Sequence, residues 1–234
     1  MLTHHEDSRA VADVLEARGL YNKRIPKVAS LERLETTFLT SAPGLRQAPR
    51  DDIAEIAFAG RSNAGKSSVL NCISGNKRMA KVSKTPGRTQ LLNFFEVALP
   101  GEARNQGRIV DLPGYGYAKA GKQAQAQWQQ AVNDYLNRRD NLAAVVLVMD
   151  IRHPNQAFDE ELIEWANSSE LPIHVLLNKM DKLGFGKAQN ALHQLVAEYK
   201  AHPLFSAQLF SALKNKGRID LIEYTIKCLT GNLT

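Results

Sequence analysis

The sequence predicts a doubly wound α/β fold, in which helices cover both faces of a mostly parallel sheet. Short apolar runs alternate with amphipathic stretches from about residue 53 to residue 229, as strands and helices do in such folds. The run Leu142–Met149 is apolar throughout, which is typical of a strand in the middle of a parallel sheet. A glycine-rich loop joins the first strand to the first helix, and ligands of such folds bind at these strand ends.

Each element is expected from its own pattern of apolar residues. Strands are expected at 53–59, 91–99, 108–112, 142–149, 172–177 and 204–210, where apolar or alternating runs end at turn residues. Helices are expected at 68–74, 123–139, 157–167, 187–200 and 219–229, where apolar residues recur at helical spacing. Residues 38–43 read as an entry strand or turn, and residues 100–107 as a hairpin turn.

The composition suits one globular domain with an extension. The chain has 234 residues, 44% of them apolar, and no apolar run long enough to span a membrane. Acidic residues near the N-terminus argue against a signal or transit peptide, and Cys72 and Cys228 make no disulfide framework. We therefore expect a monomeric, cytoplasmic protein. Residues 1–36 would form a tail or docking arm, and residues 37–234 one ligand-binding domain.

The glycine-rich loop has the pattern of a phosphate-binding loop. Residues 60–68 read GRSNAGKSS and match G-x-x-x-x-G-K-[ST] through Gly60, Gly65, Lys66 and Ser67. In this pattern backbone N–H groups surround a polyphosphate, the lysine reaches its β- and γ-phosphates, and the hydroxyl binds Mg²⁺. The helix that follows would place its N-terminus at the anion. The alternative is a plain glycine turn with an exposed lysine.

A second polar group follows the strand expected at 108–112. Asp111 and Gly114 form D-x-x-G, a pattern too short to mean anything alone, but it ends the strand downstream of the phosphate loop. There the carboxylate can hold a water on Mg²⁺ and the Gly114 N–H can meet a γ-phosphate. Residues 75–90 make a long polar loop, and such loops inside compact domains are usually functional. It offers Thr85 and Thr89 to the metal, and Thr89 is better placed because it directly precedes the next strand.

A third group indicates a guanine base. Asn178, Lys179 and Asp181 follow the strand expected at 172–177 as N-K-x-D. A carboxylate accepts from the N1–H and amine of guanine, whereas adenine would leave it unpaired. Asn178 can address the N7 side of the base or brace the phosphate loop, and the stem of Lys179 can cover the base. After the last strand, the segment Phe210–Lys214 can offer the Ala212 N–H to the guanine carbonyl.

The net charge of +6 is unevenly distributed. No acidic residue lies between Glu55 and Glu96, whereas seven basic residues do: Arg61, Lys66, Lys77, Arg78, Lys81, Lys84 and Arg88. Such a field attracts polyanions. Because it flanks the expected nucleotide site, an RNA-containing partner is favoured over a merely solvated basic face.

These motifs, in this order, resemble those of the EngB family of bacterial GTPases over about residues 37–229. The resemblance lies in the segments Phe58–Ser68, Thr85–Gln90, Asp111–Ala118 and Asp150–Pro154. It implies a cytoplasmic, Mg²⁺- and GTP-binding GTPase that switches between GTP and GDP during assembly of the large ribosomal subunit. It also implies a requirement in normal cell division and septation.

The motifs and the resemblance together define the expected site. Nucleotide contacts are expected from Gly60, Arg61, Ser62, Asn63, Ala64, Gly65, Lys66, Ser67, Ser68, Gly87, Arg88, Thr89, Gln90, Leu91, Asp111, Leu112, Pro113, Gly114, Asn178, Lys179, Met180, Asp181, Phe210, Ser211 and Ala212. The metal ligands are Ser67, Thr89 and Asp111. The residues expected to act on the phosphates during hydrolysis are Lys66, Thr89 and Asn63.

One residue predicts slow hydrolysis. Tyr115 follows Gly114, where Ras has a glutamine that orients water, and a phenol cannot replace an amide in that role. Turnover would then depend on a partner or a cation. Several GTPases with an asparagine at the place of Asn63 and no such glutamine use K⁺, and this pattern resembles theirs. The alternative is that Asn63 only caps the loop. His153 is a weaker candidate for a base than for a loop residue.

Two other functions fit parts of the sequence. A metabolic P-loop phosphotransferase would share the phosphate loop, but Asn178–Asp181 and the lack of an arginine-rich lid segment argue against it. A passive RNA-binding protein would share the basic cluster, but it would not need Lys66, Ser67, Asp111 and Asp181 together. Nucleotide selectivity separates both from a GTPase.

Overall fold

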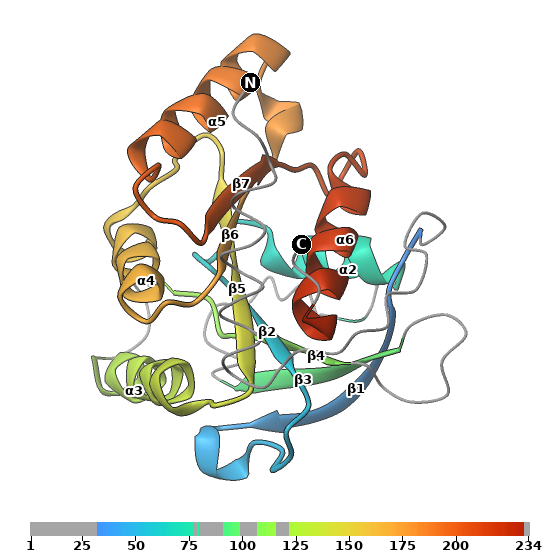
Figure 1. The fold of residues 1–234 in the computed structure, drawn as a ribbon, viewed down its shortest axis with the longest axis vertical. Helices are drawn as coiled ribbons and strands as arrows, with labels where there is room; N and C mark the ends of the chain where they lie inside the picture. The colour runs from blue at the N-terminus through green and yellow to red at the C-terminus, as the bar shows by residue number, and fades with distance from the viewer. Residues whose placement is uncertain (1–31, 77–78, 80–90, 99–106, 116–121, 232–234) are drawn as a thin grey trace.

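Seven strands form one twisted sheet with helices on both faces (Figure 1). The computed structural model describes residues 32–76, 79, 91–98, 107–115 and 122–231. The strands are β1 (Glu35–Ala42), β2 (Glu55–Gly60), β3 (Leu92–Ala98), β4 (Gly107–Asp111), β5 (Leu142–Asp150), β6 (Ile173–Asn178) and β7 (Phe205–Leu209). The helices are α2 (Lys66–Ser74), α3 (Lys122–Arg138), α4 (Ala157–Ser168), α5 (Phe185–Glu198) and α6 (Arg218–Thr230). Two short 3₁₀ helices span Leu45–Gln47 and Met180–Lys182.

The strand order is β1-β3-β4-β2-β5-β6-β7. Strands β4, β2, β5, β6 and β7 are parallel, whereas β1 and β3 run antiparallel to their neighbours at one edge. The predicted mostly parallel sheet is therefore confirmed. The pattern at 38–43 did not show how far β1 extends. This strand begins at Glu35, inside the stretch expected to be an extension, and the side chain of Leu34 before it is fully buried.

The sheet separates two hydrophobic cores. Helices α2 and α6 cover one face with residues such as Leu70 and Ile222, and helices α3, α4 and α5 cover the other (Figure 1). Strand β5 serves both cores, because successive side chains of a strand point to opposite faces. Val146 and Val148 pack in the first core, and Val145 and Leu147 in the second. The continuous apolar run in the sequence reflects this double burial.

Helix α5 lies two residues closer to the N-terminus than expected, at 185–198 instead of 187–200. Glycine is a poor helix former, yet the helix includes Gly186. In the structure Gly186 lies in the first turn, and the carbonyl of Gly184 accepts the N–H of Ala188 at 3.0 Å. A glycine so close to a helix end costs little.

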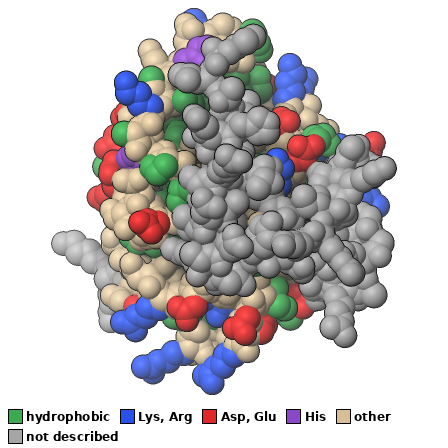
Figure 2. All heavy atoms as spheres, viewed as in Figure 1, with side chains coloured by type: hydrophobic (Ala, Val, Ile, Leu, Met, Phe, Trp, Pro, Cys, Tyr) green, Lys and Arg blue, Asp and Glu red, His purple; other side chains and the backbone are tan. Residues whose placement is uncertain are grey.

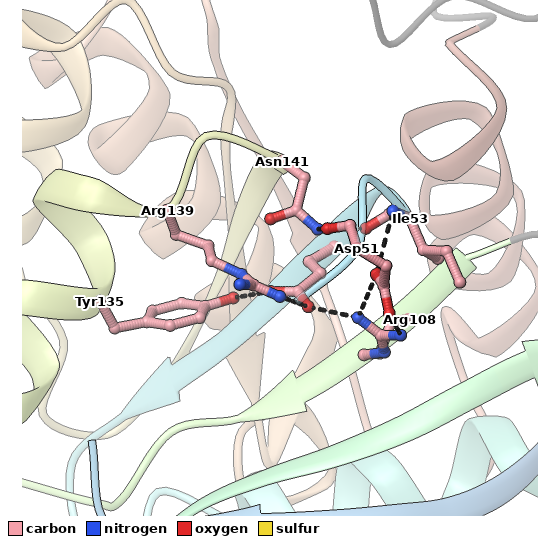
Figure 3. A network of polar contacts seen from close by, with 7 residues as sticks. Asp51, Ile53, Arg108, Tyr135, Arg139 and Asn141 are labelled. Carbon is pink, nitrogen blue, oxygen red and sulfur yellow. Dashed lines mark hydrogen bonds and ion pairs between the residues drawn. The ribbon is translucent and has the colours of Figure 1, made fainter. Parts of the chain in front are cut away.

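A buried polar network ties the amino ends of β2, β4 and β5 together (Figure 3). Glu55, the first residue of β2, is fully buried and accepts hydrogen bonds from Arg108, Arg139 and the Tyr135 hydroxyl. Arg108 in turn donates to both carboxylate oxygens of Asp51, at 3.0 and 2.8 Å. The network lies at the end of the sheet opposite the loops that carry the sequence motifs.

Candidate nucleotide-binding site

The sequence motifs follow the carboxyl ends of four neighbouring parallel strands, and a further polar segment follows β5. The segments are 60–66 after β2, 111–114 after β4, 150–152 after β5, 178–181 after β6 and 210–212 after β7. Because carboxyl ends of parallel strands share one edge of the sheet, the motifs come together there. The sheet order places the phosphate loop between the 111–114 segment and the segments expected to meet the base.

The phosphate loop leaves no room for a side chain at Gly65. This residue has φ +102°, and a Cβ there would lie 2.3 Å from Nδ2 of Asn178. That amide donates to the carbonyl of Ala64 at 2.9 Å, so Asn178 braces the loop. Its Oδ1 is buried and has no hydrogen-bond partner among the described residues. Two roles were considered for Asn178, contact with the N7 side of the base and support of the phosphate loop. The structure contains the contact that supports the loop.

Lys66 and Asp111 form an ion pair at the start of α2. Both side chains are largely buried, and Ser67 is half-buried in the same first turn. Among the described residues no three His, Cys, Asp or Glu side chains cluster to hold a metal. One carboxylate and one hydroxyl nevertheless suit Mg²⁺, which binds through hard oxygens and takes most of its ligands from phosphates and water. The residues present therefore fit Mg²⁺ bound together with a polyphosphate.

Asp181 is held as an acceptor. The Ser211 hydroxyl donates to its Oδ1 at 2.5 Å, and the Lys182 ammonium lies 3.7 Å from its Oδ2. The bond from Ser211 lowers the pKa of this carboxyl, with a smaller contribution from Lys182. The segments 178–181 and 210–212 are joined by their backbones, since the N–H of Met180 donates to the carbonyl of Phe210 at 3.1 Å. An ionised carboxylate at this position can accept two donors from a ligand.

Lys179 connects two further loops. Its backbone has φ +65°, and its ammonium donates to the carbonyl of Asn63 at 2.5 Å and to Oδ2 of Asp150 at 2.9 Å. Arg152 donates to both carboxylate oxygens of Asp150. The sequence motifs assigned no role to Asp150 or Arg152. The sign that could have identified them is their position at the carboxyl end of β5, the strand beside β6.

Tyr115 is buried, and its side chain contacts helix α4. Its hydroxyl donates to Asp159 at the start of α4, its ring packs on Phe158, and its carbonyl accepts the N–H of Ser62 at 2.8 Å. Burial raises the pKa of the Tyr115 phenol, and burial also raises the pKa of Asp159. The phenol is thus engaged with α4. This arrangement agrees with the inference that Tyr115 does not orient water.

Part of the expected site lies outside the described residues. Gly87, Arg88, Thr89 and Gln90, the alternative hydroxyl of Thr85, and the basic residues Lys77, Arg78, Lys81 and Lys84 all belong to it. Leu91 is described and precedes β3, and His153 is exposed in the loop after β5.

Comparison with known proteins identifies the family. A family model described as "50S ribosome-binding GTPase" matches residues 55–179. A protein of Haemophilus ducreyi described as "Probable GTP-binding protein EngB" is 47% identical over 186 residues, 78% of this chain and 85% of that protein. The chain belongs to the EngB family. It is accordingly a GTP-binding protein and a GTPase.

Further EngB proteins agree in sequence and in fold. A protein of Pasteurella multocida with the same description is 56% identical over 149 residues, 64% of this chain and 70% of that protein. The crystal structure of a probable GTP-binding protein EngB superposes with a TM-score of 0.58 at 23% identity, covering 75% of this chain and 98% of the other. The second likeness supports the fold alone. No helix within the described ranges has the length and apolar character needed to cross a membrane.

Proposed function

We propose that the chain is a GTP-controlled switch in the assembly of the large ribosomal subunit, and that normal cell division and septation depend on it. The observation that carries this proposal is the convergence of Lys66, Asp111, Asn178 and Asp181 at one sheet edge. It occurs in a chain matched by a model described as a ribosome-binding GTPase. A cytoplasmic location and a monomeric state belong to the same proposal.

The phosphates occupy the loop 60–68. Its backbone N–H groups and the N-terminus of α2 surround the anion, as in other phosphate loops. Lys66 then exchanges the carboxylate of Asp111 for the β- and γ-phosphates, and this exchange leaves Asp111 free to act as a metal ligand. Ser67, Asp111 and Thr89 would hold Mg²⁺, which would neutralise the charge of the phosphates.

The base lies against the loops after β6 and β7. Asp181 accepts from the N1–H and amine of guanine, and the N–H of Ala212 meets the guanine carbonyl. The bond from Ser211 fixes the carboxylate before the base arrives, which supports this assignment. Adenine presents an acceptor where guanine presents a donor, so it would leave the Asp181 carboxylate unpaired and disfavoured.

Hydrolysis is slow without help. The Tyr115 hydroxyl bonds Asp159, so no side chain at this place orients water in the manner of the Ras glutamine. A K⁺ ion held by the Asn63 side chain and phosphate oxygens would offset the charge that develops during the reaction. The exposed side chain of Asn63, in a residue at φ +68°, supports this over a purely structural cap.

The two alternative functions receive less support. Neither a metabolic phosphotransferase nor a passive RNA-binding protein requires the hydrogen bond from Asn178 to the phosphate loop or the one from Ser211 to Asp181. Membership of the EngB family favours the GTPase over both.

Sedimentation with large ribosomal subunits tests the proposal. The full chain is mixed with subunits in a non-hydrolysable GTP analogue, in GDP or without nucleotide, at low and moderate salt. We expect more protein in the pellet with the GTP analogue, and less as salt rises, because the basic residues at 77–88 release counterions from rRNA phosphates. Pelleting that is flat with salt and identical in both nucleotides would reject the assembly switch.

A further inference from the structure

Asp150 lies where three loops of the nucleotide site meet. It is the last residue of β5 and pairs in register with Asn178, the last residue of β6. Its Oδ2 accepts a hydrogen bond from the ammonium of Lys179 at 2.9 Å. The same ammonium donates to the carbonyl of Asn63 at 2.5 Å. One lysine head group therefore joins the phosphate loop, the end of β5 and the N-K-x-D segment.

The carboxylate of Asp150 is itself fixed by its own loop. Arg152 donates through Nε to Oδ1 at 2.9 Å, through Nη2 to Oδ2 at 2.6 Å, and through its backbone N–H to Oδ1 at 3.1 Å. These donors, the Arg152 side chain first and Lys179 next, lower the pKa of Asp150. Both oxygens are engaged, so the carboxylate has one orientation. Asp150 is thus a rigid acceptor for a flexible partner.

Lys179 needs such an acceptor. A lysine stem has four rotatable bonds and loses much freedom when it is ordered. Its side chain is 26% exposed, so solvent competes for the ammonium, whereas Asp150 is 15% exposed. An acceptor already in place lowers the cost of ordering the stem when a ligand binds.

We propose that Asp150 is a positioning residue for nucleotide binding. It holds the Lys179 ammonium so that the stem lies over the guanine base, and it thereby slows nucleotide release. This inference rests on the guanine site proposed above. The base is common to GDP and GTP, so release of both nucleotides depends on Asp150 to the same degree.

Release of fluorescent GDP and of a fluorescent non-hydrolysable GTP analogue tests this role by stopped flow. The variants are Asp150→Asn, Lys179→Met and the double variant. Asp134→Asn is the matched control, because Asp134 also pairs with an arginine, Arg138, but on the surface of α3. We expect Asp150→Asn to speed release of both nucleotides about five-fold, the effect of one partly exposed ion pair. The control keeps the wild-type rate, and Asp150→Asn adds nothing in the Lys179→Met background.

Several results would overturn the inference. Release at the wild-type rate in Asp150→Asn, even with a lowered melting temperature, would make Asp150 a structural residue only. An equal acceleration in the Lys179→Met background would show that Asp150 acts independently of Lys179. An effect on one nucleotide alone would place its action at the phosphates. The variant Asp181→Asn distinguishes the guanine site from the role of Asp150. If Asp181→Asn binds GDP as tightly as the wild type, the guanine site itself is wrong. If Asp181→Asn weakens GDP binding and Asp150→Asn does not, only the role of Asp150 is wrong.

Discussion

Asp181 and Ser211 come from different loops and meet through one hydrogen bond of 2.5 Å. The spacing N-K-x-D singled out Asp181, but the sequence assigned the 210–212 segment only a backbone role. In the structure the buried hydroxyl of Ser211 orients the carboxylate and also accepts the N–H of Lys214 at 3.1 Å. This contact joins residues thirty positions apart in the chain, so no local sequence pattern predicts it.

Replacing Asp181 with asparagine should weaken GTP binding at least about ten-fold, or about 1.4 kcal/mol. The asparagine side chain places an NH₂ donor opposite the donors of guanine. The guanine N1–H and amine therefore lose a hydrogen-bond acceptor. Xanthine nucleotides, with a carbonyl in place of the amine, should gain affinity. Calorimetric titration of both nucleotides into both proteins measures the exchange. Equal GTP affinity in the two proteins would remove the guanine assignment.

Asn63 should make GTP hydrolysis sensitive to K⁺. Steady-state hydrolysis is measured in K⁺ and in Na⁺ at matched ionic strength, for the wild type and for Asn63→Ala. We expect faster turnover in K⁺ for the wild type, because the bound cation offsets the negative charge that develops on the phosphates during the reaction. The advantage should disappear in the variant. If the wild type hydrolyses GTP equally fast in both salts, Asn63 is a cap and no cation site exists there.

Contacts with Asp150 and Asp159 mark the limit of prediction at this scale. The motifs expected to bind phosphate and guanine have fixed spacings, because each lies within one strand-end loop. The acceptor of the Lys179 ammonium and the acceptor of the Tyr115 hydroxyl lie 29 and 44 positions away. Only the pairing of neighbouring strands and the packing of α4 bring them close.

Among the elements, strand β2 begins with a buried charge instead of an apolar residue. Glu55 is fully buried and accepts hydrogen bonds from Arg108, Arg139 and the Tyr135 hydroxyl (Figure 3). These bonds join β2 to β4 and to the end of α3. Burial and the Glu55 carboxylate raise the pKa of the Tyr135 phenol. The network holds the amino ends of the strands whose carboxyl ends carry the phosphate loop and Asp111.

Replacing Glu55 with glutamine should lower the free energy of unfolding by about 3–5 kcal/mol. The amide keeps the shape but leaves the Arg139 guanidinium without the Glu55 carboxylate, and the buried Arg108 keeps the carboxylate of Asp51 but loses that of Glu55. Urea unfolding of the two proteins measures the difference. Glu161→Gln, an exposed site on α4, is the control and should change little. A loss below about 1 kcal/mol for Glu55→Gln would show that the network contributes little.

His174 should make stability depend on pH. It lies on β6, stacks on Tyr224 of α6 at 4.3 Å, and bonds Ser206 and Gln208 of β7. Burial lowers its pKa from 6.5 to about 4. Between these values the unfolded chain binds the proton and the folded protein does not, so stability falls as pH drops from 6.5 to 4.

The expected slope is about 1.4 kcal/mol per pH unit from this histidine. Urea unfolding between pH 4 and 7 should show it in the wild type, and His174→Gln should lack that part of the slope. Carboxylates titrate in both proteins, so the difference between the two curves isolates the histidine. Parallel curves would mean that folding does not shift the pKa of His174.

Most elements could be predicted because their patterns are local. Apolar alternation and glycine punctuation placed the strands β2–β7 and the helices within about two residues. The antiparallel pairing of β1 with β3 was not predictable in this way, because it joins residues at least fifty positions apart and depends on register. The polar start of β2 was also missed, since its partners lie on other elements.

At the scale of the whole molecule, the two ends of the sheet differ. The Glu55 network lies at the amino ends of the strands, and the loops proposed to bind phosphate and guanine lie at the carboxyl ends. Figure 2 shows acidic and basic side chains interspersed on the described surface of one face. Of the basic cluster that indicated an RNA-containing partner, Arg61 and Lys66 are described, whereas the other members lie outside the described residues: Lys77, Arg78, Lys81, Lys84 and Arg88.

The central claim is that the bound guanine nucleotide decides association with a ribosomal particle. The most direct measurement is sedimentation of wild type and Asp181→Asn with large subunits, in non-hydrolysable analogues of GTP and of xanthosine triphosphate. We predict that the GTP analogue drives association of the wild type and that the xanthosine analogue drives association of the variant. Association of the variant that still follows GTP, or association indifferent to nucleotide in both proteins, would contradict the claim.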